Sequence, residues 1–382
     1  MTDAPAGWVV GPLRKFAPLQ RGFDLPTSKV VAGDIPVVYS NGIGRYHNKA
    51  MLKGPGVVTG RSGTIGRVHF VDRDYWPHNT ALWVTDFKEC APKFVYYLLQ
   101  SVGLERFAGG SGVPTLNRND AHSFEICVPA SRDEQVSIAE ALTDADDLIS
   151  GLERMIAKKQ AIKQGMMQQL LTGRTRLPGF TGSWSMRKIG DFAEVRAGGT
   201  PSTSVSEFWG GEIPWMSSGE IHKKRVFDVN GRITTMGLQK SSAHLFPRRT
   251  VLMALAGQGK TRGTVAISHI DLTTNQSIAG IYPSSEHDPD YLYYSLDTRY
   301  SELRGESTGD GGRGGLNLTI IKNVEVPFPK VSEQRAIAAV LADVDNEVSA
   351  LSARLTKARA IKTGMMQQLL TGRTRLPVEA AS

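Results

Sequence analysis

Apolar residues recur at alternating steps of three and four positions in two long segments of the chain, residues 131–178 and 331–377. This spacing is typical of a helix that presents one apolar seam to a partner helix. No proline occurs in either segment before Pro178 and Pro377, and glycine caps are expected at Gly173 and Gly372. The pattern predicts two helices of about 40 residues, each roughly 60 Å long. The seam residues are Leu142, Ala145, Ile149, Leu152 and Ile156 in the first helix, and Leu341, Val344, Val348, Leu351 and Leu355 in the second.

The end of the first helix is repeated without a change at the end of the second. GMMQQLLTGRTRLP occupies residues 165–178 and again residues 364–377, so the two copies lie 199 positions apart. The same offset aligns Asp144 with Asp343 further upstream. Two copies are too few for a solenoid, in which each repeat packs on its neighbours. The repeat therefore predicts a chain of two halves with one plan, related by a pseudo-two-fold axis.

Charges are distributed unevenly along both predicted helices. Acidic residues gather near each start and basic residues near each end, as with Asp146 and Lys163 in the first helix and Asp345 and Lys362 in the second. This suits the dipole of each helix. It also favours antiparallel pairing, because the acidic start of one helix then lies beside the basic end of the other. The alternative is two separate surface helices, each packed on its own domain.

The segments that precede the helices carry short β-branched strands, glycine-rich loops and one amphipathic helix near Tyr96 or Tyr293. They are weakly related to each other, because residues 35–37 align with 213–215 and residues 79–81 with 275–277. The predicted fold class is α+β: two domains of small mixed β-sheets with helices, joined by two long antiparallel coiled-coil helices. The expected boundaries are 1–130 and 179–330 for the domains, 131–178 and 331–377 for the helices, and 378–382 for a tail.

The second domain contains an insertion. The offset between the domains grows from 178 at Ile35 to 194 at Val57, which places about 16 additional residues between Ile213 and Val251. A shared framework with different loops is expected when one scaffold carries two different recognition surfaces. The inserted segment carries four consecutive candidate binding residues, His222, Lys223, Lys224 and Arg225.

Composition sets the broad class of partner. The 382 residues include 45 basic and 37 acidic side chains, which gives a net charge of +8 and a pI near 9.4. This balance permits nucleic-acid binding without establishing it. The two cysteines, Cys90 and Cys127, form no CxxC motif, so a disulfide scaffold and a structural zinc site are both unsupported. The first residues resemble no secretory signal and no run of 18 apolar residues occurs, so we expect a cytoplasmic protein.

Polar and basic loop residues form one candidate DNA-binding cluster in each domain. Arginine can pair bidentately with guanine and asparagine or glutamine with adenine, whereas lysine suits phosphates. In the first domain the candidates are Asn41, Arg45, His47, Asn48, Lys49, Arg61, Ser62, Arg67, Asn79 and Arg118. In the second they are Ser217, Ser218, His222, Lys223, Lys224, Arg225, Gln258, Lys260, Arg262, Asn275, Gln276, Arg313 and Asn317. We expect Gln258 and Arg262 to occupy the position of Arg61 in the paired glycine-rich loops. For any single residue, a solvated loop is the competing interpretation.

Two patterns that suggest catalysis are better explained without it. Residues 254–261 resemble a phosphate-binding loop, but the following residues predict a strand where such a loop needs a helix. Asp144 with Asp146, and Asp343 with Asp345, lie where acidic side chains suit a helix start. The sequence contains no HExxH motif and no dinucleotide-binding fingerprint. It gives no reason to assign catalysis to this chain.

Several motifs together resemble one known family. The helices begin at residues 128–144 and 326–343 with a shared VP…EQ…IA..L…D pattern and end with QQLLTGRTRLP. The second domain also contains GGTP at residues 198–201 and FWGGEIPWMSSGEI at residues 208–221. In these features the whole chain resembles the DNA-specificity subunit of type I restriction–modification systems. The first domain departs from the pattern, because residues 31–43 keep the Ile-Pro pair but not the WGG.

The resemblance implies a division of labour. Each of two target-recognition domains would read one half of a split DNA sequence, and the helices would act as spacer and docking surface. Two modification subunits, which bind S-adenosylmethionine and methylate adenine at N6, would dock there, and restriction subunits can join them in such systems. The chain itself would hold no cofactor. The expected spacer and docking residues are Leu142, Ile149, Leu152, Ile156, Met166, Met167, Leu341, Val348, Leu351, Leu355, Met365 and Met366.

Two other functions make different predictions. A free-standing two-domain DNA-binding regulator would need no partner enzymes and no docking face on its helices. A nucleotide-dependent enzyme that uses Lys260 would bind ATP as an isolated chain. An exposed apolar patch on the helices that includes Met166, Met167, Met365 and Met366 would favour the subunit interpretation.

Overall fold

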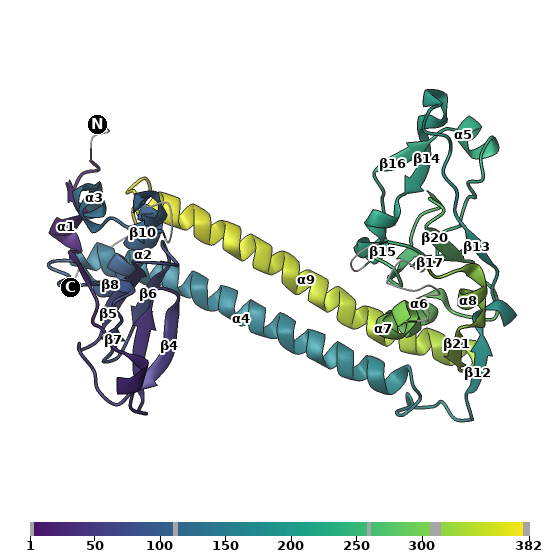
Figure 1. The fold of residues 1–382 in the computed structure, drawn as a ribbon, viewed down its shortest axis with the longest axis horizontal. Coiled ribbons are helices and arrows are strands. Elements are labelled where there is room, and N and C mark those ends of the chain that lie inside the picture. Colours follow the sequence, from purple (N-terminus) through teal and green to yellow (C-terminus); the bar gives the residue numbers. More distant parts are fainter. Residues whose placement is uncertain (1–3, 110–113, 258–260, 306–314, 377–382) are drawn as a thin grey trace. The chain divides into compact units, whose positions relative to one another are not determined.

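The computed structural model describes residues 4–109, 114–257, 261–305 and 315–376. The chain divides into two compact units, of which unit 1 comprises residues 1–154 and 352–382 and unit 2 comprises residues 155–351. Each unit therefore combines one sheet-containing domain with half of each long helix (Figure 1).

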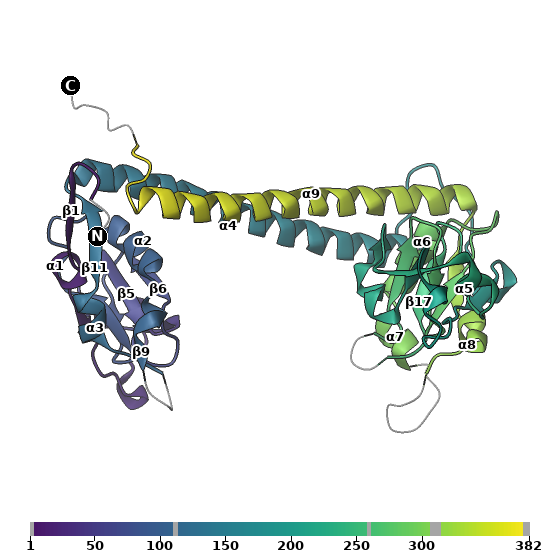
Figure 2. The ribbon, with the colours of Figure 1, turned by 90° about the horizontal axis from the view of Figure 1, so that it is seen from above.

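The two long helices are α4 (Arg132–Leu170) and α9 (Val331–Leu369), each of 39 residues, as the apolar pattern predicted. They pack antiparallel and run side by side in Figures 1 and 2. In unit 1, Lys362 near the end of α9 pairs with Asp146 near the start of α4, at 2.6 Å between Nζ and Oδ1. In unit 2, Lys163 pairs with Asp345 at 2.5 Å. The charge distribution predicted this pairing, and two separate surface helices are excluded.

The seam residues are buried or half-buried, with Leu142, Leu152 and Leu341 at most 1% exposed. The repeated methionines lie inside the units as well. Met167 is 8% exposed, Met166 packs against the unit 2 core, and Met365 and Met366 pack against the unit 1 core. The four methionines therefore do not form the exposed patch that would favour the subunit interpretation, because each helix end fills the core of a domain. The exposed large apolar side chains of the two helices are Val136, Leu148, Met155, Ile162 and Ile361.

Unit 1 is built on a four-stranded sheet of order β2-β8-β5-β6 and a three-stranded sheet of order β4-β3-β7. Helix α2 packs against β5 and β6, and the β1–β11 pair leads into α4. The elements are β1 (Trp8–Pro12), α1 (Leu13–Phe16), β2 (Leu19–Arg21), η1 (Thr27–Lys29), β3 (Ile35–Tyr39), β4 (Gly42–His47), β5 (Gly56–Gly60), β6 (Val68–Val71), β7 (Trp76–Pro77), β8 (Ala81–Val84), α2 (Pro92–Val102), η2 (Leu104–Phe107), β9 (Ala108–Gly109), β10 (Thr115–Leu116), α3 (Arg118–Ser123) and β11 (Glu125–Pro129).

Unit 2 repeats this plan, with five strands in its main sheet where unit 1 has four. Its main sheet has the order β13-β20-β17-β18-β15, with a three-stranded sheet β16-β14-β19 beside it. Helix α6 packs against β17 and β18, as α2 packs in unit 1. The elements are β12 (Ser185–Lys188), η3 (Ile189–Asp191), β13 (Val195–Ala197), η4 (Ser206–Phe208), β14 (Trp209–Met216), η5 (Ser218–Lys223), β15 (Arg225–Val226), β16 (Gly231–Ile233), α5 (Thr235–Gln239), β17 (Val251–Ala254), β18 (Val265–Ser268), β19 (Thr273–Thr274), β20 (Ile278–Ile281), α6 (Pro289–Asp297), α7 (Tyr300–Gly305), α8 (Leu318–Asn323) and β21 (Glu325–Phe328).

A buried glutamate holds each helix start to the end of the other helix. In unit 2, Arg176 donates two hydrogen bonds to Glu333, at 2.6 and 2.7 Å, and Trp184 donates a third at 3.2 Å. Arg375 and Trp8 make the equivalent contacts with Glu134 in unit 1. Glu134 and Glu333 are only 1% and 3% exposed, so each carboxylate depends on these donors. The repeated EQ and GRTRLP motifs therefore close the two units in the same way.

Candidate nucleic-acid interface

Three segments meet the loop that follows β5 in unit 1. The backbone N–H groups of Arg61 and Ser62 donate to the Thr80 carbonyl at 2.9 and 3.1 Å. The Leu116 N–H donates to the Arg61 carbonyl at 2.8 Å. The β3–β4 turn approaches the same loop, because a Cβ on Gly60 would lie 3.1 Å from the Ser40 carbonyl oxygen. Several candidate residues of the first domain are therefore fixed around one loop by backbone contacts.

The candidate side chains of unit 1 differ in how accessible they are. Asn41, Asn48, Lys49, Arg67 and Arg118 are exposed. Arg45, Arg61, Ser62 and Asn79 are half-buried, and His47 is buried. The Arg45 guanidinium lies 5.9 Å from the Tyr39 ring centroid, and the Asn79 amide donates to Asp24. The exposed set is therefore better placed to meet a partner molecule than His47.

The insertion of unit 2 lies in the connection between β14 and β16, and it contains η5 and β15. This connection corresponds to the two-residue turn between β3 and β4 in unit 1. Three of its basic side chains pair with acidic ones. Lys223 pairs with Glu220 at 2.8 Å, Lys224 with Asp297 at 2.5 Å and Arg225 with Asp290 at 2.8 Å, whereas His222 is exposed.

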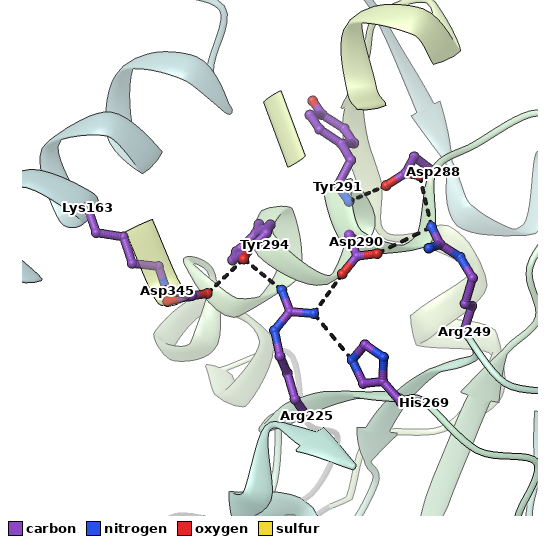
Figure 3. Close-up of polar contacts among 9 residues, drawn as sticks. All are labelled: Lys163, Arg225, Arg249, His269, Asp288, Asp290, Tyr291, Tyr294 and Asp345. Carbon is purple, nitrogen blue, oxygen red and sulfur yellow. Dashed lines mark hydrogen bonds and ion pairs between the residues drawn. The ribbon is translucent and has the colours of Figure 1, made fainter. Parts of the chain in front are cut away.

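Arg225 lies at the centre of a polar network that Figure 3 shows. Its Nη1 donates to Asp290 and lies 3.4 Å from His269 Nε2, and its Nη2 donates to the Tyr294 hydroxyl at 2.7 Å. Tyr294 in turn donates to Asp345 of α9 at 2.7 Å. Burial lowers the pKa of His269, and the Arg225 charge lowers it further. A neutral His269 can accept from Arg225.

Hydrogen bonds give a register between the domains that differs from the sequence alignment. Ala81 and Ile278 accept equivalent backbone bonds, from Gly22 and Gly198, and they lie 197 positions apart. Asn79 therefore corresponds to Gln276. The alignment of Asn79 with Asn275 is wrong by one residue, because a weak repeat with unequal loops does not fix the strand register.

Arg61 also has a different counterpart from the expected one. Leu255 makes both of its backbone contacts, because its N–H donates to Ser277 and its carbonyl accepts from Leu316. Arg262, which the sequence placed opposite Arg61, instead precedes Gly263 at the position of Ile65 before Gly66, and it is 8% exposed. The backbone contacts at Arg61 and Leu255, which are the same in both units, therefore make Leu255 and not Arg262 the counterpart of Arg61.

The remaining candidates of unit 2 have mixed surroundings. Asn317 accepts from the Ile320 N–H at 2.9 Å and so caps α8. Gln276 is exposed and accepts from Thr200. Asn275 lies 3.5 Å from the Ser218 hydroxyl, and Ser217 begins η5 with a capping box. Gln258, Lys260 and Arg313 lie outside the described residues.

The GGTP segment at residues 198–201 and the tryptophan-containing segment at residues 208–221 pack closely against neighbouring parts of the second domain. A Cβ on Gly198 would lie 2.1 Å from Thr274, and one on Gly199 would lie 2.3 Å from the backbone of Ser242. Trp215 donates to the Gly199 carbonyl at 3.1 Å and meets Trp209 edge to face. These residues hold β14, and so the start of the insertion, in place.

Sequence reasoning missed the tyrosines, Tyr97 and Tyr294, that join each domain to the helices. In unit 1, Tyr97 donates to Asp146 at 2.9 Å. Tyr294 makes the equivalent bond to Asp345 in unit 2. The signal was available, because both aspartates and their lysine partners obey the 199-residue offset.

Other kinds of site receive no support from the part of the chain that is described. A strand, β18, follows the candidate phosphate loop, as the sequence predicted. Residues 4–109, 114–257, 261–305 and 315–376 contain no group of three or more His, Cys, Asp or Glu side chains that could hold a metal ion. Within the same residues, no helix combines the length and apolar character needed to cross a bilayer.

Comparison with known proteins follows the same division of the chain. The family model described as "Type I restriction modification DNA specificity domain" matches residues 5–164 and again residues 182–358. The chain is 35% identical over 167 residues to the MjaIX specificity subunit of Methanocaldococcus jannaschii. The matched stretch covers 43% of this chain and 38% of that protein. It is 21% identical over 295 residues to the EcoR124I/EcoR124II specificity subunit of Escherichia coli, which covers 75% of this chain and 72% of that one.

Solved structures agree at the level of the fold. The S subunit of a type I system from M. genitalium superposes with a TM-score of 0.69 at 16% identity, over 97% of both chains. A chain from a structural study of complex assembly in the type I R-M system gives 0.56 at 15% identity, over 98% of this chain and all of the other.

Two copies of one recognition domain on an antiparallel helix pair define a DNA-specificity protein. The chain belongs to the type I restriction–modification DNA specificity family. It is an S subunit, the component that recognises the DNA target and is not itself catalytic.

Proposed function

We propose that the chain reads a bipartite DNA target, with one target-recognition domain for each half-site. The domains would span residues 1–130 and 179–330, and the helices at 131–178 and 331–377 would separate them. The observation that carries this proposal is the repeated framework, in which equivalent backbone contacts at Arg61 and Leu255 hold loops of different sequence. Two modules tied by a rigid connection can address two segments of the major groove.

The candidate contact residues divide by accessibility. The exposed candidates in unit 1 are Asn41, Asn48, Lys49, Arg67 and Arg118, and those in unit 2 include His222 and Gln276. Arginine and amide side chains among them would read base edges, and lysine would bind phosphate. The half-buried residues Arg61 and Ser62 would contribute by holding the loop and by reaching one base edge.

We infer further that the helix pair docks two modification subunits, which methylate adenine at N6 in systems of this family, and that restriction subunits can join the assembly. The helix surface offers a physical basis for docking. Leu148 is 52% exposed, Ile361 51%, Met155 46% and Ile162 42%, so apolar side chains remain available on both helices. A free-standing regulator would need no such surface.

The test is to produce the chain together with the modification subunit of its own system and to sequence methylated adenines in the host genome. We expect a complex with two modification subunits for each S chain and one bipartite methylated motif. The isolated chain should have no methyltransferase, nuclease or ATPase activity. A complex of one to one as the sole assembly, or a methylated motif without two separated halves, would contradict the proposal.

A further inference from the structure

Both units carry the same three-residue connection between the domain and the helices, which we name the tyrosine link. It consists of Tyr97, Asp146 and Lys362 in unit 1, with 2.9 and 2.6 Å between the bonded atoms. In unit 2 it consists of Tyr294, Asp345 and Lys163, with 2.7 and 2.5 Å. The lysine ammonium also lies over the tyrosine ring in each unit, at 5.5 and 5.3 Å from the centroid. The link joins the domain helix to both long helices.

The units differ in the second cation that lies beside the link. In unit 1 it is Lys93 of α2 itself, 4.2 Å from the Phe70 centroid and 5.5 Å from that of Tyr96. In unit 2 the position of Lys93 is occupied by Asp290, because each follows the first proline of its helix. The cation there is Arg225, whose guanidinium lies 5.4 Å from the ring centroids of both Tyr293 and Tyr294. The inserted segment of unit 2 thus supplies the cation that helix α2 supplies in unit 1.

Arg225 also begins the strand that the insertion adds to the sheet. Strand β15 pairs parallel with β18, with Arg225 opposite Ile267. Among the described strands of unit 1, β6 is the corresponding edge and has no such neighbour. Two strand residues provide little pairing energy of their own, so β15 depends on what its side chains hold.

The donors of Arg225 are directed into the unit. Its side chain is 24% exposed and that of Asp290 17%, and Tyr294 is fully buried. Burial acts to lower the pKa of Arg225, but Asp290 and the Tyr294 hydroxyl outweigh it and raise the pKa. Arg249 completes the cluster, with 2.9 Å to Asp288 and 3.2 Å to Asp290. A guanidinium bonded to Asp290, Tyr294 and His269 has few donors left for DNA.

We propose that Arg225 is a positioning residue of the second recognition domain, which fastens the inserted segment through Asp290 and Tyr294 to Asp345 of α9. This inference rests on the proposed function for its effect on DNA recognition. The sequence placed Arg225 among the DNA contacts, and the geometry points to a different role (Figure 3). Loss of the Arg225 hydrogen bonds would let the inserted segment, with the exposed His222, shift relative to Asp345 of α9.

Two substitutions separate positioning from DNA contact. Arg225→Met removes the hydrogen bonds to Asp290 and to Tyr294 while keeping a long side chain. Tyr294→Phe removes only the hydroxyl that joins Arg225 to Asp345, and this buried group cannot touch DNA. The matched control is Arg248→Met, which makes the same charge change at an exposed side chain of the same unit.

The first measurement uses the chain without DNA. Hydrogen–deuterium exchange should accelerate by about tenfold or more at the amides of Ile267 and His269, which donate to the Lys224 and Val226 carbonyls of the inserted segment. This is expected in Arg225→Met and in Tyr294→Phe, since each loses at least one part-buried charge-assisted hydrogen bond. The double variant should exchange no faster than the faster single variant, because both act through one connection. Arg248→Met should match the parent. Unchanged exchange in both single variants would overturn the inference.

The second measurement uses the complex with modification subunits and a series of targets with different gaps between the half-sites. Both variants should accept neighbouring gap lengths more readily than the parent, with an unchanged dependence of affinity on salt. A salt slope reduced by about one in Arg225→Met alone, with no effect of Tyr294→Phe, would make Arg225 a phosphate contact and overturn the inference. A parent complex with no gap preference would contradict the proposed function, whereas the exchange result would still decide the role of Arg225.

Discussion

Arg61 combines a structural backbone with a side chain at the predicted recognition surface. Its N–H and carbonyl groups hold two other segments, and these contacts do not depend on the side chain. Arg61→Ala should therefore preserve the loop and lose only side-chain contacts. We expect a loss of about 1–3 kcal/mol in discrimination at one base pair of the first half-site, with the second half-site unaffected.

Quantitative methylation of targets with single base changes would measure this effect. Arg73→Ala, at an exposed arginine of the same unit, is the control and should change nothing. Equal weakening on every target would instead identify Arg61 as a phosphate contact.

His287 makes the stability of unit 2 depend on pH. Burial, followed by the charge of Arg249, lowers the pKa of His287 from 6.5 to about 4. Its Nδ1 lies 2.9 Å from the Ser284 hydroxyl, and its ring meets Phe192. As the pH falls below 6.5 the unfolded chain takes up the proton first, so this contribution to stability is present at neutral pH and is lost towards pH 4. The loss reaches about 3 kcal/mol at ~1.36 kcal/mol for each pKa unit.

Urea unfolding at pH 7.5 and pH 5.0 would test this prediction. His287→Gln should reduce the difference between the two pH values by about 2 kcal/mol, the part of that linkage expected by pH 5. His244→Gln, at an exposed histidine, should leave it unchanged. A parent protein that is equally stable at both pH values would show that His287 does not govern this dependence.

The length of the two long helices, α4 and α9, should set the gap between the two half-sites. Leu152 and Leu351 occupy equivalent seam positions, 199 apart. Inserting one heptad after each would keep the seam in phase and lengthen both helices by roughly 10 Å at ~1.5 Å per residue. B-DNA advances ~3.4 Å per base pair. The preferred gap should therefore lengthen by about three base pairs, with both half-sites unchanged.

Methylation of a target series with graded gaps would show the shift. A four-residue insertion after Leu152 alone adds about one turn, roughly 6 Å, and should lengthen the gap by one or two base pairs. The same gap for parent and heptad variant would mean that the helices do not set it.

The repeat makes a prediction for the whole molecule. A fragment that ends at Pro178 contains the first domain and α4 but lacks the α9 end that completes the unit 1 core with Leu369 and Leu370. A second copy supplies the identical residues Leu170 and Leu171, and its Arg176 can replace Arg375 on Glu134. The fragment should form a C2 homodimer that reads an inverted repeat of the first half-site.

Sedimentation equilibrium of the fragment, followed by methylation mapping with the modification subunit, would test this. Ala145 stands where the second helix has Val344, so the homodimer seam is smaller and the dimer should dissociate more readily than the parent helix pair separates. Ala145→Val is the matched variant and should tighten the dimer. A fragment that stays monomeric at micromolar concentration would show that the two halves are not interchangeable.

The sequence by itself determined the helices, their antiparallel pairing, the repeat and the family. These features depend on local periodicity, on charge along one element or on identical residues, all of which are visible in the printed chain. The heptad seam predicted two helices of about 40 residues, and each has 39, because an apolar period near 3.5 indicates a helix whereas a half-buried strand has a period of 2. Lys163 and Asp345 could be expected to meet because the charge distribution favoured antiparallel pairing, which places the start of one helix beside the end of the other.

Only the tertiary structure decided the register of the domains and the roles of single loop residues. The pairing of Asn79 with Gln276 follows from backbone hydrogen bonds, which a one-residue slip in a weak alignment conceals. The sequence placed Arg225 among the candidate DNA contacts because its partner Asp290 lies 65 positions away, on helix α6, which contacts the inserted segment only in the folded chain. Whether a basic residue faces solvent or a buried carboxylate is set by packing between distant segments, and neither periodicity nor composition carries that information.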